Sequence, residues 1–198
     1  MSTKTQQKLW NLAWKLLLEA QNSPKSPYGT PVVSTVSTNG VPASRVLVLR
    51  GAAEEEGALT CYTDSRSLKV TQLQQSPSFM SWTFWSPEHQ LQFSCSGPTE
   101  GLSTSICQEV FQGLPKHARK AYAALSPPGT ELDQVGDALP DDWATLELDQ
   151  TNYAAKNFLI LKTRITRAEV LQLNREGNCR LLAKRDTSKK WKFQWVVP

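Results

Sequence analysis

Three stretches decide the fold of this chain: SRVLVLRG (residues 44–51), CYTDSRSLK (61–69) and FWSPEHQLQF (84–93). The first has the aliphatic run of a short strand, and the second begins as a strand at about 57–63. The third reads as a strand, a Ser-Pro turn and a return strand. Asn39-Gly40, between strands predicted at 32–38 and 41–50, is the strongest hairpin signal. Short antiparallel strands of this kind favour a small closed or split barrel over a parallel sheet.

Working outward, the sequence predicts a helix at about 5–21, because Trp10, Ala13, Trp14 and Leu17 recur at helical spacing on one face. The tryptophans of this face are expected to pack in the core. The run SPPGTELDQVGDALPDD is rich in Pro, Gly and Asp and predicts a surface loop. The remaining predicted elements are helices at about 66–75, 102–112 and 115–124 and strands at 78–85, 89–96, 157–165, 168–173, 180–184 and 191–196.

Arg45 and Arg50 stand at the two ends of the aliphatic run 46–49. A guanidinium is always charged and binds phosphate oxygens in a fork. An ideal strand has a period of two, so side chains five positions apart point to opposite faces unless the strand bends or bulges. The spacing therefore does not by itself bring the two arginines together, and two strand ends that reach into solvent remain the alternative.

A phosphate cradle is indicated where the second strand ends, at Asp64, Ser65, Arg66 and Ser67. Asp and Ser are preferred helix caps. A helix that begins here would direct its free N–H groups, Ser67 and Lys69 at one point, which is a favourable place for an anion. A capped helix with one basic residue that binds nothing remains the alternative.

The third stretch combines aromatic side chains with glutamines. Phe79, Trp82, Phe84 and Trp85 on a strand indicate core packing. On the return strand, Gln90 and Gln92 are expected to share one face, opposite Leu91 and Phe93. An inward glutamine can pair with the carbonyl and imide edge of a ring.

In this order, the three stretches resemble the pyridoxamine 5'-phosphate oxidase family of FMN-binding split barrels, and in particular a divergent subgroup known from cyanobacteria. The residues 45–50, Tyr62-Thr63, Ser67 with Lys69, and Gln90 match its motifs, and residues 180–184 and WKFQWVVP match more weakly. The resemblance implies a mainly β (α+β) fold, an antiparallel six-stranded split β-barrel with flanking helices. A single FMN-binding domain over residues 1–198 and a homodimer with FMN at its interface are further implications.

The resemblance also implies the residues that contact FMN. Arg45, Lys69 and Arg66 would meet the phosphate, Gln90 would contact the ring edge, and Arg50 and Arg180 would contact substrate. The implied cofactor-binding set is Arg45, Val46, Leu47, Val48, Leu49, Arg50, Tyr62, Thr63, Arg66, Ser67, Lys69, Gln90 and Lys184.

Departures from the family pattern concern the substrate. The family's extra arginine before the phosphate-helix lysine is Leu68 here, and its first-motif lysine is Arg50. Its substrate tyrosine and arginine fall on Val110 and Leu114, and Leu182 replaces the histidine of its Arg-x-His pair. The resemblance therefore implies an FMN-dependent oxidoreductase with an altered pocket for a small-molecule substrate. The alternatives are a non-catalytic flavin-binding dimer and a split barrel that binds another ligand such as haem.

Composition excludes several other classes. The chain has 198 residues, enough for one domain, and its net charge of +4 comes from 22 basic and 18 acidic residues that are interspersed, so no nucleic-acid surface is indicated. Four cysteines without CxxC spacing and two histidines, His89 and His117, predict neither a metal site nor a hydrolase triad. No catalytic acid or base is evident. No apolar run approaches the ~20 residues of a membrane span, and a cytoplasmic protein is expected.

Overall fold

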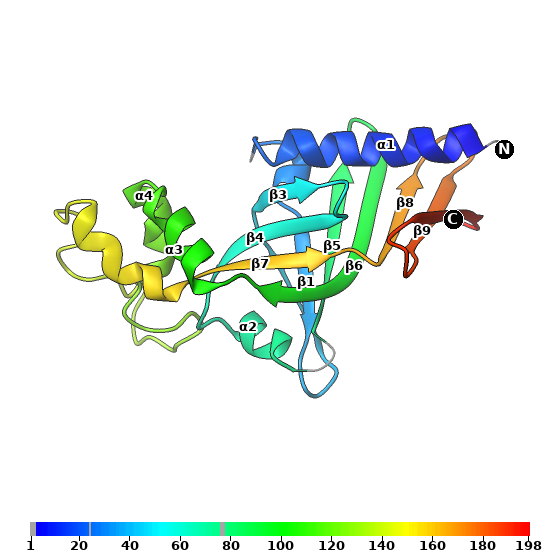
Figure 1. Ribbon diagram of the computed structural model, residues 1–198. Helices are drawn as coiled ribbons and strands as arrows, with labels where there is room; N and C mark the ends of the chain where they lie inside the picture. Colours follow the sequence, from blue (N-terminus) through cyan, green and yellow to red (C-terminus); the bar gives the residue numbers. More distant parts are fainter. Residues whose placement is uncertain (1–2, 24, 76–77) are drawn as a thin grey trace.

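The computed structural model describes residues 3–23, 25–75 and 78–198, and its strands curl into a half-barrel crossed by one long helix (Figure 1). The helices are α1 (Thr3–Ala20), α2 (Leu68–Leu73), α3 (Thr104–Gln112) and α4 (Lys116–Arg119), with short 3₁₀ helices η1 (Pro27–Gly29), η2 (Lys120–Tyr122) and η3 (Asp149–Asn157). The strands are β1 (Val32–Val36), β2 (Pro42–Val46), β3 (Leu49–Ala53), β4 (Ala58–Asp64), β5 (Phe79–Ser86), β6 (Leu91–Gly101), β7 (Phe158–Arg164), β8 (Arg167–Gln172), β9 (Cys179–Arg185) and β10 (Trp191–Val196).

All strand pairs in the described residues are antiparallel, as predicted for a split barrel. One path runs β10-β9-β8-β6-β5-β1-β2, while β7 joins β6 to the β3-β4 pair. The prediction of a mainly β split barrel with flanking helices is confirmed. The described residues contain ten strands rather than six, because β8, β9 and β10 extend the sheet beyond the barrel and because the run predicted at 41–50 is divided into β2 and β3.

The long strand β6 is the place where the sheet divides. Its first part pairs with β8 over Leu91–Ser96, and its last part pairs with β7 from Thr99 to Gly101. Between the two parts, Gly97 lies directly against the chain where β7 turns into β8. A Cβ atom built on Gly97 would overlap the backbone carbonyl oxygen of Arg164. Only glycine allows this approach, so Gly97 makes the division of the sheet possible.

We expect Gly97→Ala to destabilise the fold by about 1–3 kcal/mol, because the new methyl group meets backbone rather than a side chain that can move. Urea unfolding followed by tryptophan fluorescence measures this loss. Gly136→Ala is a matched control, because nothing lies within 4 Å of a Cβ at that glycine. Equal stability of the two variants would contradict the assigned role of Gly97.

The main core lies between α1 and the sheet. The predicted apolar face of α1 is confirmed, since Trp10 is 2% exposed and Ala13, Trp14 and Leu17 are fully buried. The ring of Trp10 lies 4.7 Å from that of Trp191 in β10 and 6.0 Å from that of Phe93 in β6. Helix α1 therefore holds the barrel and its β8–β10 extension together.

A second, smaller cluster packs α3, η2 and η3 around Phe111, Tyr122 and Phe158. The guanidinium of Arg119, in a residue only 2% exposed, joins these elements through backbone carbonyls. It donates to the oxygens of Gln112 and Leu114 at 2.9 Å each, and its remaining bonds go to Leu148, Thr151 and Asn152. Burial lowers the pKa of Arg119, and these acceptors stabilise its charge. This cluster fixes α4 beside the open end of the barrel.

Several predicted boundaries differ from the structure. The strand predicted at 41–50 breaks after Val46 and resumes at Leu49, and the helix predicted at 66–75 is only Leu68–Leu73. The return strand begins at Leu91, so Gln90 lies in the preceding turn. Helix η3 was not predicted and takes the place of the loop before β7. None of the helices in the described ranges has the length and apolar character needed to cross a bilayer.

Candidate functional site

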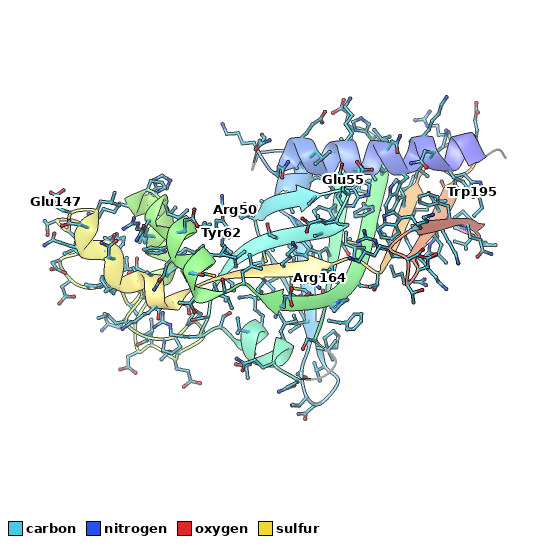
Figure 2. The ribbon with its side chains drawn as sticks, viewed as in Figure 1. Arg50, Glu55, Tyr62, Glu147, Arg164 and Trp195 are labelled. Atoms are coloured by element: carbon cyan, nitrogen blue, oxygen red, sulfur yellow. The ribbon has the colours of Figure 1, made fainter. Side chains whose placement is uncertain are left out.

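A cleft of about 450 Å³ opens between the β2–β4 side of the barrel and the α4–η2 segment, within the ~300–1,000 Å³ typical of small-molecule sites. Figure 2 shows Arg50 and Tyr62 next to each other at this end of the barrel. The lining residues are Val46, Leu47, Val48, Arg50, Tyr62, Thr63, Asp64, Ser67, Lys69, His117, Ala118, Ala121, Tyr122 and Pro128. Eight of these were predicted from the sequence.

The broken strand explains how residues 46–48 and Arg50 reach the cleft. Leu47 leaves the β2 ladder, its N–H donates to the oxygen of Pro31 at 3.1 Å, and Val48 follows before β3 begins. Beyond the break, the register between β3 and β4 shifts between Leu49 and Gly51, so that Arg50 is an irregular position. A break and a shift of this kind change the alternation of side chains. They place Arg50 in the wall of the cleft, beside Tyr62.

At one end of the cleft, the ammonium group of a lysine is bound by two hydroxyl groups. Nζ of Lys69 donates to Oγ1 of Thr63 and to Oγ of Ser67, at 2.9 Å each. Thr63 and Ser67 are themselves buried, at 4% exposure each. Ser67 is the N-cap position of α2, but its side chain makes no capping bond. Its hydroxyl donates instead to the backbone oxygen of Asp64 at 2.7 Å.

Arg45 is the second cation at this end. Its Nη1 donates to Oγ1 of Thr35 at 2.7 Å, and the Thr35 hydroxyl donates to Oε1 of Gln72 in α2. Burial, and next the nearby charge of Arg45, lower the pKa of Lys69, and burial lowers the pKa of Arg45. In the described part of the chain, neither cation has a carboxylate within ion-pair distance. Two adjacent, half-buried cations without an acidic partner are favourable for binding an anion.

Asp64 is an acidic residue in the wall of the cleft, and it is already paired. Its carboxylate accepts from Nε of Arg66 at 3.0 Å and from Nη2 of Arg66 at 2.7 Å. Arg66 also donates to the backbone oxygens of Ala124 at 2.9 Å and Leu125 at 3.4 Å. The hydrogen bonds that its side chain donates to Asp64 raise the pKa of Arg66. Arg66 itself does not line the cleft.

The rest of the cleft is a largely apolar slot with aromatic walls. The guanidinium of Arg50 lies 5.3 Å from the ring centre of Tyr62, in cation–π contact. On the opposite side α4 and η2 contribute His117, Ala118, Ala121 and Tyr122. A cleft with these walls can accommodate a flat ring that carries an anionic group, with the anionic group toward Lys69.

Six predicted site residues do not line the cleft: Arg45, whose charge acts on Lys69 from nearby, and five that lie elsewhere in the chain. Leu49 is buried in the main core at 1% exposure, and Gln90 donates from Nε2 to the oxygen of Pro87 in the β5–β6 turn. Lys184 is exposed on β9, and Arg180 of the same strand is paired with Glu169. Figure 1 shows β9 on the side of the barrel away from α4. With Arg66, these residues are not brought into the cleft of this chain.

The predicted set of contact residues did not include the lining residues Asp64, His117, Ala118, Ala121, Tyr122 and Pro128. A signal existed for most of them, because the segment EVFQGLPKHARKAY matched the family's substrate helix. The positions taken from that match, Val110 and Leu114, instead pack against the second hydrophobic cluster. A wider depression of about 560 Å³ lies along α1 and contains none of the predicted site residues.

Known proteins resemble this chain in sequence and in fold. Residues 9–102 match the family model of the pyridoxamine 5'-phosphate oxidase FMN-binding domain. A pyridoxine/pyridoxamine 5'-phosphate oxidase of Deinococcus deserti is 31% identical over 103 residues, which are 52% of this chain and 46% of the relative, so the chain spans about half of that relative's length. A relative of the same name from Leptospira interrogans is 24% identical over 91% of this chain and 84% of its own length.

Among solved structures, a pyridoxamine 5'-phosphate oxidase-related, FMN-binding protein of Nostoc punctiforme superposes with a TM-score of 0.76. It is 25% identical, and the alignment covers 96% of this chain and 97% of the other. The similarity therefore extends over the barrel, the α3–α4 segment and the β8–β10 extension. The matched family region contains the strand break and Lys69 with its two hydroxyl partners.

Proposed function

The chain belongs to the pyridoxamine 5'-phosphate oxidase-like family of FMN-binding split barrels, and from this membership we propose that it is an oxidoreductase that uses FMN in the cleft beside Lys69. One observation carries the proposal: Lys69 and Arg45 are adjacent, half-buried cations whose contacts are all to hydroxyl groups. The cofactor phosphate is an anion of matching charge. The chemistry of the site fits FMN.

The residues that would hold FMN divide into two groups. Lys69, Arg45, Thr63 and Ser67 would bind the phosphate through charge-assisted hydrogen bonds. The apolar wall at 46–48 and the ring of Tyr62 would lie along the flavin and exclude water from one face. Bound FMN supplies two-electron transfer, while the protein orients the substrate and sets the electrostatics.

Substrate would enter beside Arg50. This side chain is exposed, lies over the ring of Tyr62 and makes no ion pair in the described ranges. The facing wall offers His117 and small or aromatic side chains, so an anionic group of the substrate would meet Arg50 and a flat body would meet Tyr122. The positions that match the family's substrate tyrosine and arginine are the apolar Val110 and Leu114. These differences support an altered substrate pocket.

A homodimer would complete the site. Val46 lines the cleft yet is 62% exposed, and Val32 on the neighbouring strand is 42% exposed. Gln90, Lys184 and Arg180 do not line this cleft. Gln90 and Lys184 would therefore reach FMN, and Arg180 would reach the substrate, only from a second copy of the chain. Light scattering tests this arrangement. A monomer that binds FMN tightly would overturn it.

FMN affinity is expected to fall at alkaline pH. Burial and the charge of Arg45 lower the pKa of Lys69 in the free protein, whereas a bound phosphate favours the charged lysine and raises its pKa. Binding is therefore strongest below the free-protein pKa and weakens as pH rises through it. Fluorescence titrations with FMN across this range measure the trend. A Lys69→Gln variant should show a flatter profile, and an equal slope would contradict the assignment.

The experiment that tests the function begins with the visible spectrum of the purified protein and the mass of any released chromophore. We expect the released chromophore to be FMN. We also expect an amine, an alcohol or a nicotinamide donor to reduce the flavin in the intact protein. Screening would begin with pyridoxamine and pyridoxine phosphates. Failure of all these donors to reduce a protein that holds FMN would leave a flavin-binding dimer without catalysis.

A further inference from the structure

An acidic side chain lies in the wall of the cleft next to the proposed phosphate site. Asp64 is 5% exposed and stands between Thr63 and Ser67 in the sequence, the two residues whose hydroxyl groups contact Lys69. A buried carboxylate at this place would repel a phosphate across a short distance of low dielectric constant. An FMN site can contain it only if its charge is compensated.

Arg66 supplies that compensation in full. Its Nε and Nη2 atoms bind the two carboxylate oxygens of Asp64 separately, and its backbone N–H donates to Oδ1 at 2.8 Å. The side chain of Asp64 is 4% exposed and that of Arg66 is 23% exposed, so solvent screens this pair little. Lys69 and Arg45 then remain as the uncompensated charges at this end of the cleft.

Arg66 also fixes the opposite wall. Its Nη2 atom donates to the backbone oxygen of Ala124 at 2.9 Å, just after η2 and before the segment whose Pro128 lines the cleft. One guanidinium thus joins the strand end that carries Asp64 to the far side of the cleft. These contacts use four of the five N–H donors of the guanidinium: Nε and both N–H groups of Nη2 bind Asp64 and Ala124, and one N–H of Nη1 makes a 3.4 Å bond to the oxygen of Leu125. A phosphate would therefore meet one free N–H rather than a free edge of this side chain.

We propose that Arg66 is a positioning residue that makes the cleft selective for the phosphorylated flavin by neutralising Asp64, and that it is not itself a phosphate ligand. The inference rests on the proposed FMN site. Leu68, which stands where the family has an additional arginine, is 64% exposed, so the selectivity depends on charge balance rather than on a further direct contact.

Four proteins test the proposal: the natural chain, Arg66→Gln, Asp64→Asn and the double variant. Dissociation constants are measured by flavin fluorescence for FMN and for riboflavin, which has no phosphate. Arg66→Gln should weaken FMN about ten-fold or more, since it leaves Asp64 charged, with little change for riboflavin. Asp64→Asn should bind FMN at least as tightly as the natural chain. The double variant should recover most of the lost affinity.

Two outcomes would overturn the inference. If the double variant binds FMN as weakly as Arg66→Gln, then Arg66 contacts the phosphate directly. If riboflavin weakens as much as FMN in Arg66→Gln, then the residue has only a structural role. Riboflavin binding also shows that the cleft of each variant is folded. Failure of the natural chain to bind either flavin would instead refute the proposed function.

Discussion

Replacing both Lys69 and Arg45 with alanine is expected to raise the dissociation constant for FMN by about 10²- to 10⁴-fold. Each cation would contribute a charge-assisted contact worth ~1.5–3 kcal/mol, and each 1.4 kcal/mol corresponds to a factor of ten. Hydroxyl groups of Thr63 and Ser67 would remain as weaker donors. The loss should be confined to the phosphate, so riboflavin should bind the double variant nearly as well as it binds the natural chain.

Fluorescence titration with both flavins measures this effect. Lys15→Ala combined with Arg164→Ala is a matched control, because it removes the same two charges from exposed positions that do not line the cleft. The control should bind FMN with little change at moderate salt. An unchanged FMN affinity in the folded Lys69/Arg45 variant would refute the placement of the cofactor in this cleft.

Replacing Trp10 with alanine is expected to lower the free energy of unfolding by ~3–5 kcal/mol, the usual cost of removing a large buried aromatic side chain. Its ring contacts those of Trp14, Phe93, Trp191 and Phe193, with centroids 4.7–6.0 Å away. The variant would lose contacts to β6 and β10 at once and leave a cavity beneath α1.

Urea unfolding followed by circular dichroism measures this change. Trp10→Phe keeps an aromatic ring and should lose much less stability. Trp85→Ala is a second control, because Trp85 is 39% exposed on β5. A loss below ~1 kcal/mol for Trp10→Ala, as for an exposed site, would contradict the packing assigned to α1.

The sequence predicted the elements whose structure is set by residues close together in the chain. The apolar face of α1 follows from helical spacing, and the Asn39-Gly40 hairpin follows from turn chemistry; both are present. The break after Val46 and the division of the sheet at Gly97 depend on contacts with Pro31 and Arg164, which are distant in the sequence. Helix η3 lacks a strong periodic pattern and was missed for that reason.

The candidate site was predictable where one short segment builds it. Thr63, Ser67 and Lys69 lie within seven residues, and the structure brings them together. Arg66 lies in the same segment but turns to Asp64 and to Ala124, and the pattern of residue types carries no information on that choice. The wall formed by His117 and Tyr122 depends on how the second cluster packs beside the barrel.

The two hydrophobic clusters have a consequence for cooperativity. The barrel cluster and the α3–η2–η3 cluster are separate, and Leu159 is the partly buried residue that packs against both in the described part of the chain. In the cleft, Leu47 packs against the barrel cluster and Tyr122 belongs to the second, so local unfolding of either cluster would remove part of the cleft wall. A ligand bound between them adds its binding free energy to the folded state alone. Cofactor occupancy would therefore stabilise both clusters at once and couple their unfolding.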